Sequence, residues 1–194
     1  MSESHSDYPI QSAPFTQVAV DDSFWAPRIN TTIKVTIPYD FQKCEETGRI
    51  DNFAKAGGLM EGAHEGIFFN DSDVFKVVEG AAYALQITPN AQLETYLDDL
   101  IDKFAAAQEA DGYLYTARTI DPANAPEPCG PERWSNLRIN HELYNVGHMY
   151  EAAVAFFEAT GKRMFLDIAL RKADLIDSVF GVDGVGDVPG HEEI

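Results

Sequence analysis

Paired amphipathic segments repeat along this chain of 194 residues, and the repeat limits the possible fold more than any other feature. Glu79 and Glu151 stand 72 positions apart, and the run Asp-Leu-Ile-Asp occurs at 99–102 and again 75 positions later, at 174–177. Each unit reads as a helix, a short break, a second helix and a long loop. Helix pairs of this kind bury a common core by stacking on neighbouring pairs. The sequence therefore predicts an all-α fold.

Apolar spacing and capping residues set the expected helix boundaries. Asn70-Asp-Ser-Asp73 offers side-chain oxygens that can cap a first turn, and the spacing predicts a helix from Val74 to Ile87 after it. The same spacing predicts three further helices in the two units, over 91–109, 141–159 and 162–180.

The remaining segments have other patterns. We expect residues 1–14 to be a flexible tail, and Phe15–Val20, which alternates and is rich in β-branched residues, to be a short N-terminal β-strand. A helix is expected over about 29–47. No clear period marks 49–70, so we expect a long loop there, and a Pro-rich loop over 113–137.

The loop lengths distinguish two ways of stacking the pairs. The connection inside each pair is a few residues long, whereas the loop between pairs runs to roughly 25 residues. The pairs could form an open superhelix or a closed toroid. If the first helix of each pair is the inner one, all long loops and all inner-helix starts lie at the same end of the fold.

Three polar residues then occupy corresponding places at that end. Asp73 opens the first inner helix, His141 opens the second, and His191 would open a third. Helix starts carry free N–H groups and partial positive charge, which suit polar ligand atoms. Each residue also has a plainer explanation, because Asp73 can cap its helix and either histidine can be a packed or loop residue.

Aromatic residues of the second long loop would rim the same end, as sugar-stacking platforms or as a packed lid; they are Tyr113, Tyr115 and Trp134. A mixture of Asp, His and aromatic faces suits a neutral, hydroxyl-rich ligand.

The stretch from His141 to His148 is not a zinc-protease motif, because Asn145 stands where the second histidine would be. On a helix the two histidines are separated by a rise of about 10 Å, which is too far to share one metal ion easily. We therefore assign no metal-binding residue in this chain.

Charge and cysteine content exclude several classes of protein. The net charge of −18 argues against nucleic acid or an anionic membrane as partner. Neither a signal peptide nor a run of about 18 apolar residues is visible. Cys44 and Cys129 have no metal or redox spacing, so we expect free thiols and a cytoplasmic protein.

Taken in order, the motifs of this chain resemble those of glycoside hydrolase family 127, the β-L-arabinofuranosidase-like enzymes, over about residues 15–194. The resemblance implies a six-hairpin (α/α) toroid, of which this chain would supply the N-terminal part: two helical hairpins and the start of a third. It rests on Asp22-Ser-Phe-Trp-Ala-Pro-Arg28, Phe69-Asn-Asp-Ser-Asp-Val-Phe-Lys76, His141-Glu-Leu-Tyr-Asn-Val-Gly-His148 and Pro189-Gly-His-Glu-Glu193.

The resemblance also implies an activity, that of a retaining exo-glycosidase whose nucleophile is a zinc-bound cysteine thiolate. His141 and His191 match the substrate-hydroxyl contacts of the family, and Asp73 lies in a motif near them. The nucleophile, the zinc ligands and the acid/base of the family all fall downstream of the equivalent of Ile194. We therefore expect a substrate-binding wall without catalytic residues, and zinc only in the full-length enzyme.

Two other classes of protein remain open from the residues alone. One is a stand-alone helical-repeat binding module. The other is a different six-hairpin sugar enzyme, such as an unsaturated glucuronyl hydrolase or an epimerase. The partner expected is a small-molecule carbohydrate, and the sequence indicates no oligomeric state.

Overall fold

The computed structural model describes residues 13–194, and within them every regular element is helical, which confirms the all-α prediction. The long helices begin and end within three residues of their predicted bounds. The elements are η1 (Phe15–Gln17), α1 (Trp25–Thr31), η2 (Thr32–Thr36), α2 (Ile37–Glu46), α3 (Arg49–Ala56), α4 (Asp71–Ile87), α5 (Ala91–Ala107), α6 (Thr116–Thr119), η3 (Pro122–Asn124), η4 (Glu127–Cys129), α7 (Glu142–Thr160) and α8 (Met164–Phe180).

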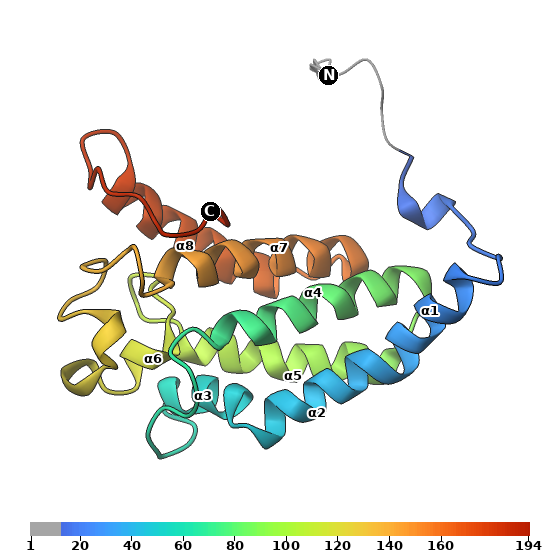
Figure 1. Ribbon diagram of the computed structural model, residues 1–194, viewed down its shortest axis with the longest axis horizontal. Coiled ribbons are helices and arrows are strands. Elements are labelled where there is room, and N and C mark those ends of the chain that lie inside the picture. The colour runs from blue at the N-terminus through green and yellow to red at the C-terminus, as the bar shows by residue number, and fades with distance from the viewer. Residues whose placement is uncertain (1–12) are drawn as a thin grey trace.

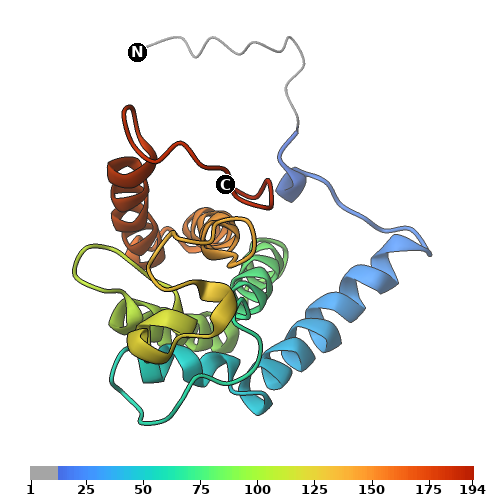
Figure 2. The same ribbon diagram turned by 60° about the vertical axis from the view of Figure 1, so that its left-hand side comes forward.

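The first helix of each repeat unit packs against the first helix of the other. Helices α4 and α7 lie side by side along their length and run in the same direction, while α5 and α8 lie on their outer side (Figures 1 and 2). Tight connections join α4 to α5 and α7 to α8, and both long loops gather at the end where α4 and α7 begin (Figure 1). The inner-helix starts and the long loops therefore share one end, as the loop lengths predicted.

A cluster of phenylalanines joins the inner and outer helices. Phe104 of α5 lies at its centre, with its ring centroid 4.5 Å from that of Phe53 and 5.2 Å from those of Phe75 and Phe165. All four side chains are buried. Burial of such a ring stabilises a fold by about 1.5–3 kcal/mol, and each aromatic pair adds about 0.5–1.5 kcal/mol. This cluster therefore fixes how α3, α4, α5 and α8 pack.

The N-terminal helical segment contains one wide turn. A π-helical turn, Thr32–Thr36, joins α1 to α2 without a break. Pro38 follows directly, and its ring has no N–H to donate and crowds the carbonyl of Lys34 one turn earlier. A wider turn relieves that crowding, which is a recognised cause of such irregularities in helices.

Two expectations for the N-terminal region are wrong, and a third lies mostly outside the described residues. Phe15–Gln17 forms a 3-10 turn and not a β-strand, because no second strand is present among residues 13–194 to pair with it. The expected loop 49–70 contains helix α3. Its apolar residues Ile50, Phe53 and Ala54 follow helical spacing, but Gly48 and the glycines after Ala56 obscured so short a helix. The tail expected over 1–14 falls largely in residues 1–12, which the structure does not describe.

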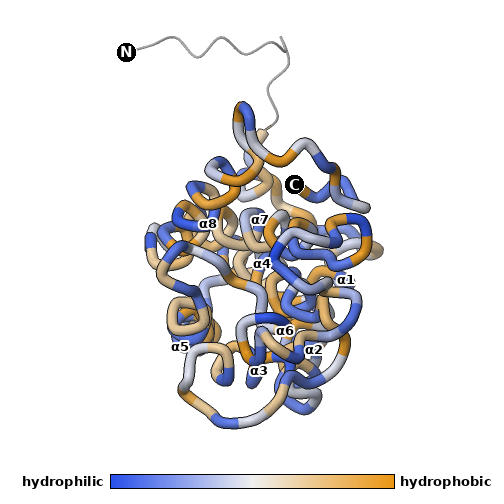
Figure 3. Tube along the Cα trace, turned by 90° about the vertical axis from the view of Figure 1, so that its left-hand side faces the viewer, coloured by the Kyte–Doolittle hydropathy of each residue, from blue (hydrophilic) through white to orange (hydrophobic). Residues whose placement is uncertain are grey.

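The loop end of the molecule is mixed in polarity. Hydrophilic stretches alternate with hydrophobic ones in the loops around the starts of α4 and α7, which face the viewer in Figure 3. Among the described residues, every helix is too short or too polar to cross a lipid bilayer.

Candidate functional site

His141 stands at the start of α7 in an unusual backbone conformation. Its φ of 64° is left-handed, and the ring nitrogen Nδ1 lies 2.5 Å from the carbonyl oxygen of Ile139. The imidazole stacks on the ring of Phe69, with centroids 4.4 Å apart and an interplanar angle of 18°. Phe68 meets it edge-on at 5.6 Å. One face of the imidazole is therefore covered, and its orientation is fixed.

His191 lies beside His141, although 50 residues separate them in sequence. Their ring centroids are 4.4 Å apart, and the ring of His191 lies 4.9 Å from that of Tyr144. Two glycines allow the C-terminal segment to approach this closely. A Cβ on Gly147 would come within 1.5 Å of the carbonyl oxygen of Glu193, and one on Gly190 within 2.2 Å of that of Arg138. The sequence analysis placed both histidines at one end of the fold, and the structure brings their rings into contact.

A polar stripe continues from His141 along the open side of α4 and α7. The ammonium of Lys76 donates a hydrogen bond of 2.6 Å to the hydroxyl of Tyr144 and lies 4.6 Å from its ring centroid. One turn further on, the ring of His148 meets Tyr144 edge-on at 4.6 Å. Nδ1 of His148 is 3.5 Å from Glu151, which is long for a hydrogen bond. Lys76 was missed as a site residue, although it lies one helical turn after Asp73.

The histidines of the stripe favour the neutral form. Burial lowers the pKa of His141 below its ordinary value against the opposing effect of the Ile139 carbonyl, and the positive charge of Lys76 adds to the lowering. Burial also lowers the pKa of His148, and the nearby carboxylate of Glu151 only partly opposes this. A neutral imidazole has one N–H donor and one acceptor nitrogen. In His141 the donor is Nδ1, which faces the carbonyl of Ile139, so Nε2 is left to accept a hydrogen bond from a hydroxyl of a ligand.

Asp73 belongs to the neighbouring cleft and does not touch either histidine. Its carboxylate pairs with Nε of Arg49 at 2.9 Å, and both side chains remain partly exposed. A cleft of about 470 Å³ between α2 and α4 is lined by Asp73, Arg49, Lys76 and Cys44, among others. Lys76 lines this cleft and also reaches Tyr144, so it connects Asp73 to the histidine pair.

The start of α4 is fixed differently from the capping that the sequence predicted. Asn70 occupies the N-cap position but makes no capping bond, and its side chain donates to the carbonyl of Glu65 at 2.8 Å. The buried carboxylate of Asp71 instead accepts from the backbone N–H of Thr116 at 2.8 Å and from the hydroxyl of the same residue at 2.5 Å. These bonds attach the long second loop to the start of α4.

The loop aromatics form a packed lid and not a row of stacking platforms. Tyr113 and Tyr115 are 0% exposed, and their hydroxyls donate to the carboxylate of Glu142 and to the carbonyl of Asn140. Trp134 is half-buried and meets the ring of Tyr113 edge-on at 5.4 Å. Periodicity in a loop does not show which way its side chains point, so the sequence alone left both interpretations open.

Neither cysteine suits a zinc site. Cys44 and Cys129 lie in separate hydrophobic clusters, and both are buried and unpaired. Burial raises the pKa of the Cys44 thiol to about 11 and also raises that of Cys129. Zinc requires thiolates and a set of converging ligands. Within residues 13–194, no three His, Cys, Asp or Glu side chains converge in that way.

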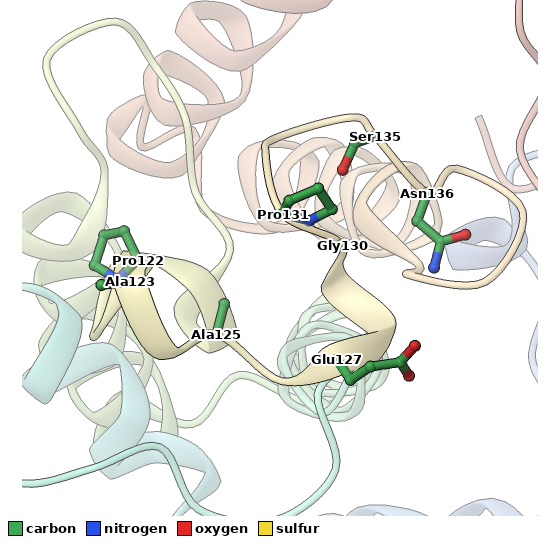
Figure 4. Close-up of a pocket in the computed structure, with 8 residues that line it drawn as sticks. All are labelled: Pro122, Ala123, Ala125, Glu127, Gly130, Pro131, Ser135 and Asn136. Atoms are coloured by element: carbon green, nitrogen blue, oxygen red, sulfur yellow. The ribbon is translucent and has the colours of Figure 1, made fainter.

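A hollow of about 470 Å³ lies apart from the histidine pair, within the second long loop. It is lined only by residues between Pro122 and Asn136, and Figure 4 shows Pro122 and Ala123 on one side with Ser135 and Asn136 on the other. It contains none of the residues of the polar stripe. We therefore take the histidine pair with its stripe, and not this hollow, as the candidate site.

The arrangement defines a polar wall suited to a neutral hydroxylated ligand, and the family match agrees with that class. Residues 17–192 match the family described as "Beta-L-arabinofuranosidase, GH127 catalytic domain". This chain belongs to that family. The match favours the glycosidase interpretation over a helical-repeat binding module or another six-hairpin sugar enzyme.

Individual relatives agree with the family assignment. The chain is 32% identical to a "Non-reducing end beta-L-arabinofuranosidase" of Bifidobacterium longum subsp. longum, in a match that covers 91% of this chain and 30% of the relative. The structure superimposes on a solved GH127 β-arabinofuranosidase with a TM-score of 0.90 and 48% identity, covering 95% of this chain and 30% of that one. It also superimposes on a GH127 β-L-arabinofuranosidase from Geobacillus stearothermophilus T6, with a TM-score of 0.83 and 41% identity. That match covers 90% of this chain and 28% of the other. The chain thus spans less than a third of the length of these relatives.

Proposed function

We propose that this chain forms the N-terminal part of an exo-acting glycoside hydrolase domain for β-L-arabinofuranosides, and that His141 and His191 bind hydroxyl groups of the terminal sugar. The contact between the two rings, 4.4 Å apart, is the observation that carries this proposal. It is supported by the family match over 17–192 and by the arabinofuranosidase activity for which the relatives are named. Asp73, in the adjoining cleft with Lys76, would bind a further hydroxyl.

The chemistry of the wall supports a neutral sugar as ligand. The neutral imidazole of His141 can accept a hydrogen bond at Nε2, because Nδ1 faces the carbonyl of Ile139, while Lys76 and Tyr144 offer donors a turn away. The net charge of −18 opposes a polyanionic ligand such as nucleic acid. A small-molecule carbohydrate is therefore the partner that we propose.

We further propose that the groups that break the glycosidic bond belong to the part of the family domain that this chain does not span. Cleavage with retention of configuration needs a nucleophile and a separate acid/base. Both thiols of this chain are buried and protonated, and the carboxylate of Glu142 is buried and engaged by three donors. Any zinc requirement would likewise belong to residues outside this chain.

The remaining parts of the proposal concern architecture and location. Two hairpins, α4–α5 and α7–α8, with parallel inner helices are the arrangement from which an (α/α)6 toroid is built, and we propose that this chain supplies that portion. The two unpaired cysteines accord with a cytoplasmic location, because reducing compartments keep thiols free.

Titration of the 194-residue chain with methyl β-L-arabinofuranoside tests the binding proposal. NMR resonances of the imidazole protons of His141 and His191 should shift in a saturable manner. The α-anomer serves as the matched ligand control and should shift them less. His141→Ala should weaken binding by about tenfold, the amount that one lost hydrogen bond of about 1.4 kcal/mol represents.

Arg163→Ala, at the exposed start of α8, provides a control variant and should bind the sugar as the wild type does. If neither histidine responds to the sugar, or if His141→Ala binds it with unchanged affinity, the assignment of these residues as sugar contacts is wrong.

A further inference from the structure

We propose, taking the identity of the ligand from the proposed function, that Glu142 is the positioning residue of this site. Its buried carboxylate holds His141 in the left-handed backbone conformation that directs the imidazole toward His191. Glu142 itself is 1% exposed, so it acts through its neighbours and does not contact the ligand.

The left-handed conformation of His141 requires such support. A non-glycine residue with positive φ costs on the order of 1 kcal/mol or more, and it persists where its surroundings enforce it. Among the described residues, positive φ outside glycine occurs at Trp134 (65°), His141 (64°) and Asp183 (73°). Glu142 accepts a hydrogen bond from the backbone of Trp134 and directly follows His141 in sequence.

The hydrogen bonds of Glu142 clamp both sides of His141. Before His141, the amide of Asn140 donates to the carboxylate of Glu142, and the Asn140 side-chain oxygen accepts from the backbone N–H of Glu142 at 3.0 Å. This reciprocal pair closes a small ring around His141. The backbone N–H of Trp134 donates to the same carboxylate at 2.8 Å. One carboxylate thus ties the two left-handed residues together.

Tyr113 and Lys172 complete the cluster around Glu142. The hydroxyl of Tyr113 donates to the other oxygen of Glu142. The ammonium of Lys172, also 1% exposed, lies 4.1 Å from the ring centroid of Tyr113 and 4.8 Å from that of Trp134. Burial lowers the pKa of Lys172 to about 7, while the charge of Glu142 opposes this. Loss of one member would leave buried partners unsatisfied, so the cluster holds together as a unit.

Two variants test the role of Glu142 through the position of the His141 ring. The stacking on Phe69 should move the imidazole proton resonance of His141 upfield, and Phe69→Leu measures how much of that shift the stacking causes. In Glu142→Gln, the new side-chain NH2 group would face one of the groups that donate to the carboxylate in the wild type. In Tyr113→Phe, the hydroxyl that donates to Glu142 is removed. We expect both variants to lose more than half of the stacking shift while the dispersion of distant resonances is unchanged.

Tyr96→Phe is the matched control. It removes a tyrosine-to-carboxylate hydrogen bond of 2.8 Å, to Glu45, far from the histidine pair, and should leave the His141 resonance where it is. If Glu142→Gln does not fold, Tyr113→Phe decides the question. An unchanged His141 resonance in Tyr113→Phe, or an equal change in Tyr96→Phe, would show that Glu142 has only a structural role.

Affinity for the sugar separates this proposal from the assignment of the ligand. Glu142→Gln and Tyr113→Phe should weaken binding of methyl β-L-arabinofuranoside by about tenfold, because one hydrogen bond to a displaced histidine is lost. The ring position is measured without sugar. A wild type that binds no sugar therefore contradicts the proposed function alone, and an undisplaced ring contradicts the positioning role alone. A displaced ring with unchanged affinity contradicts the assignment of His141 as a sugar contact.

Discussion

The carbonyl oxygen of Glu193 lies directly over Gly147, at a place 1.5 Å from where a Cβ of that residue would be. No side chain fits there, so this close approach determines where His191 can lie. The segment is held further by the backbone N–H of Gly190, which donates to the carbonyl of Leu137 at 3.3 Å. The absence of one methyl group on α7 therefore allows the two histidines to meet.

Gly147→Ala should separate His191 from His141. The added methyl displaces the C-terminal segment, and sugar affinity should fall by about tenfold as the His191 contact is lost. The free energy of unfolding should change little or rise by up to about 1 kcal/mol, since alanine favours a helix over glycine. The NMR resonances of His191 and a thermal unfolding curve measure the two effects.

Gly80→Ala is the control for that experiment. Gly80 lies within α4, and nothing lies within 4 Å of the place where its Cβ would be. It should gain the same helical stability and leave His191 unmoved. An unshifted His191 in Gly147→Ala would mean that the segment can pass around a methyl group.

Phe104→Ala should destabilise the fold by about 3–5 kcal/mol, because it removes the ring at the centre of the phenylalanine cluster and leaves a cavity. Urea unfolding followed by circular dichroism measures this loss. Phe24→Ala removes a ring that is 53% exposed and should change stability by no more than about 0.5 kcal/mol. Similar effects for both variants would contradict the assignment of the core.

Asp71 should make stability depend on pH between about 4 and 6. Burial raises its pKa from 3.8 to about 6, against the hydrogen bonds from Thr116. A carboxyl group whose pKa is raised on folding favours the folded state when protonated, so its contribution is complete below about pH 4 and disappears as pH rises through about 6. The difference in unfolding free energy between wild type and Asp71→Asn should fall across this range by on the order of 3 kcal/mol.

Thr116→Val provides a second measurement of the same group. It removes the hydroxyl that donates to Asp71, and that bond favours the charged carboxylate. The pH at which stability declines should therefore move upward in Thr116→Val. A pH profile identical to that of the wild type would show that Asp71 does not titrate in this range.

Asp73→Asn separates binding from stability. The ion pair with Arg49 is partly exposed, and pairs of this kind contribute about 1 kcal/mol or less. Stability should therefore change by less than about 1 kcal/mol. If Asp73 binds a sugar hydroxyl, affinity for methyl β-L-arabinofuranoside should fall by about tenfold. Equal affinity would place Asp73 outside the sugar site.

The four long helices were predictable because each carries an apolar face with helical spacing over 17 or more residues. The repeat placed His141 and His191 at one end of the fold, but the contact between their rings was not predicted. Helix α3 was not found because eight residues between glycines give too short a pattern. The strand expected at Phe15–Val20 failed because a strand depends on a partner that local spacing does not reveal.

The details of the site depend on contacts between distant residues, and these could not be read from local pattern. Tyr113 faces inward because Glu142, 29 positions later, needs a donor. The capping predicted from Asn70-Asp-Ser-Asp73 failed for a similar reason: the amide of Asn70 donates to the carbonyl of Glu65, and the carboxylate of Asp71 accepts from Thr116. In each case a bond across the fold outweighed a local preference.

The wide turn at Thr32–Thr36 has a consequence for the helix that contains it. Trp25, Ile29, Ile33, Ile37 and Phe41 recur every four residues, and in a straight α-helix such a row would spiral away by about 40° at each step. One extra residue in a turn offsets about 100° of that drift. The row thus keeps facing α4, where most of its members line one apolar groove. Deletion of a single residue from 32–36 would rotate the part of the helix before it by about 100° about the helix axis. Trp25 and Ile29 would then no longer face α4, while Phe41 would keep its position.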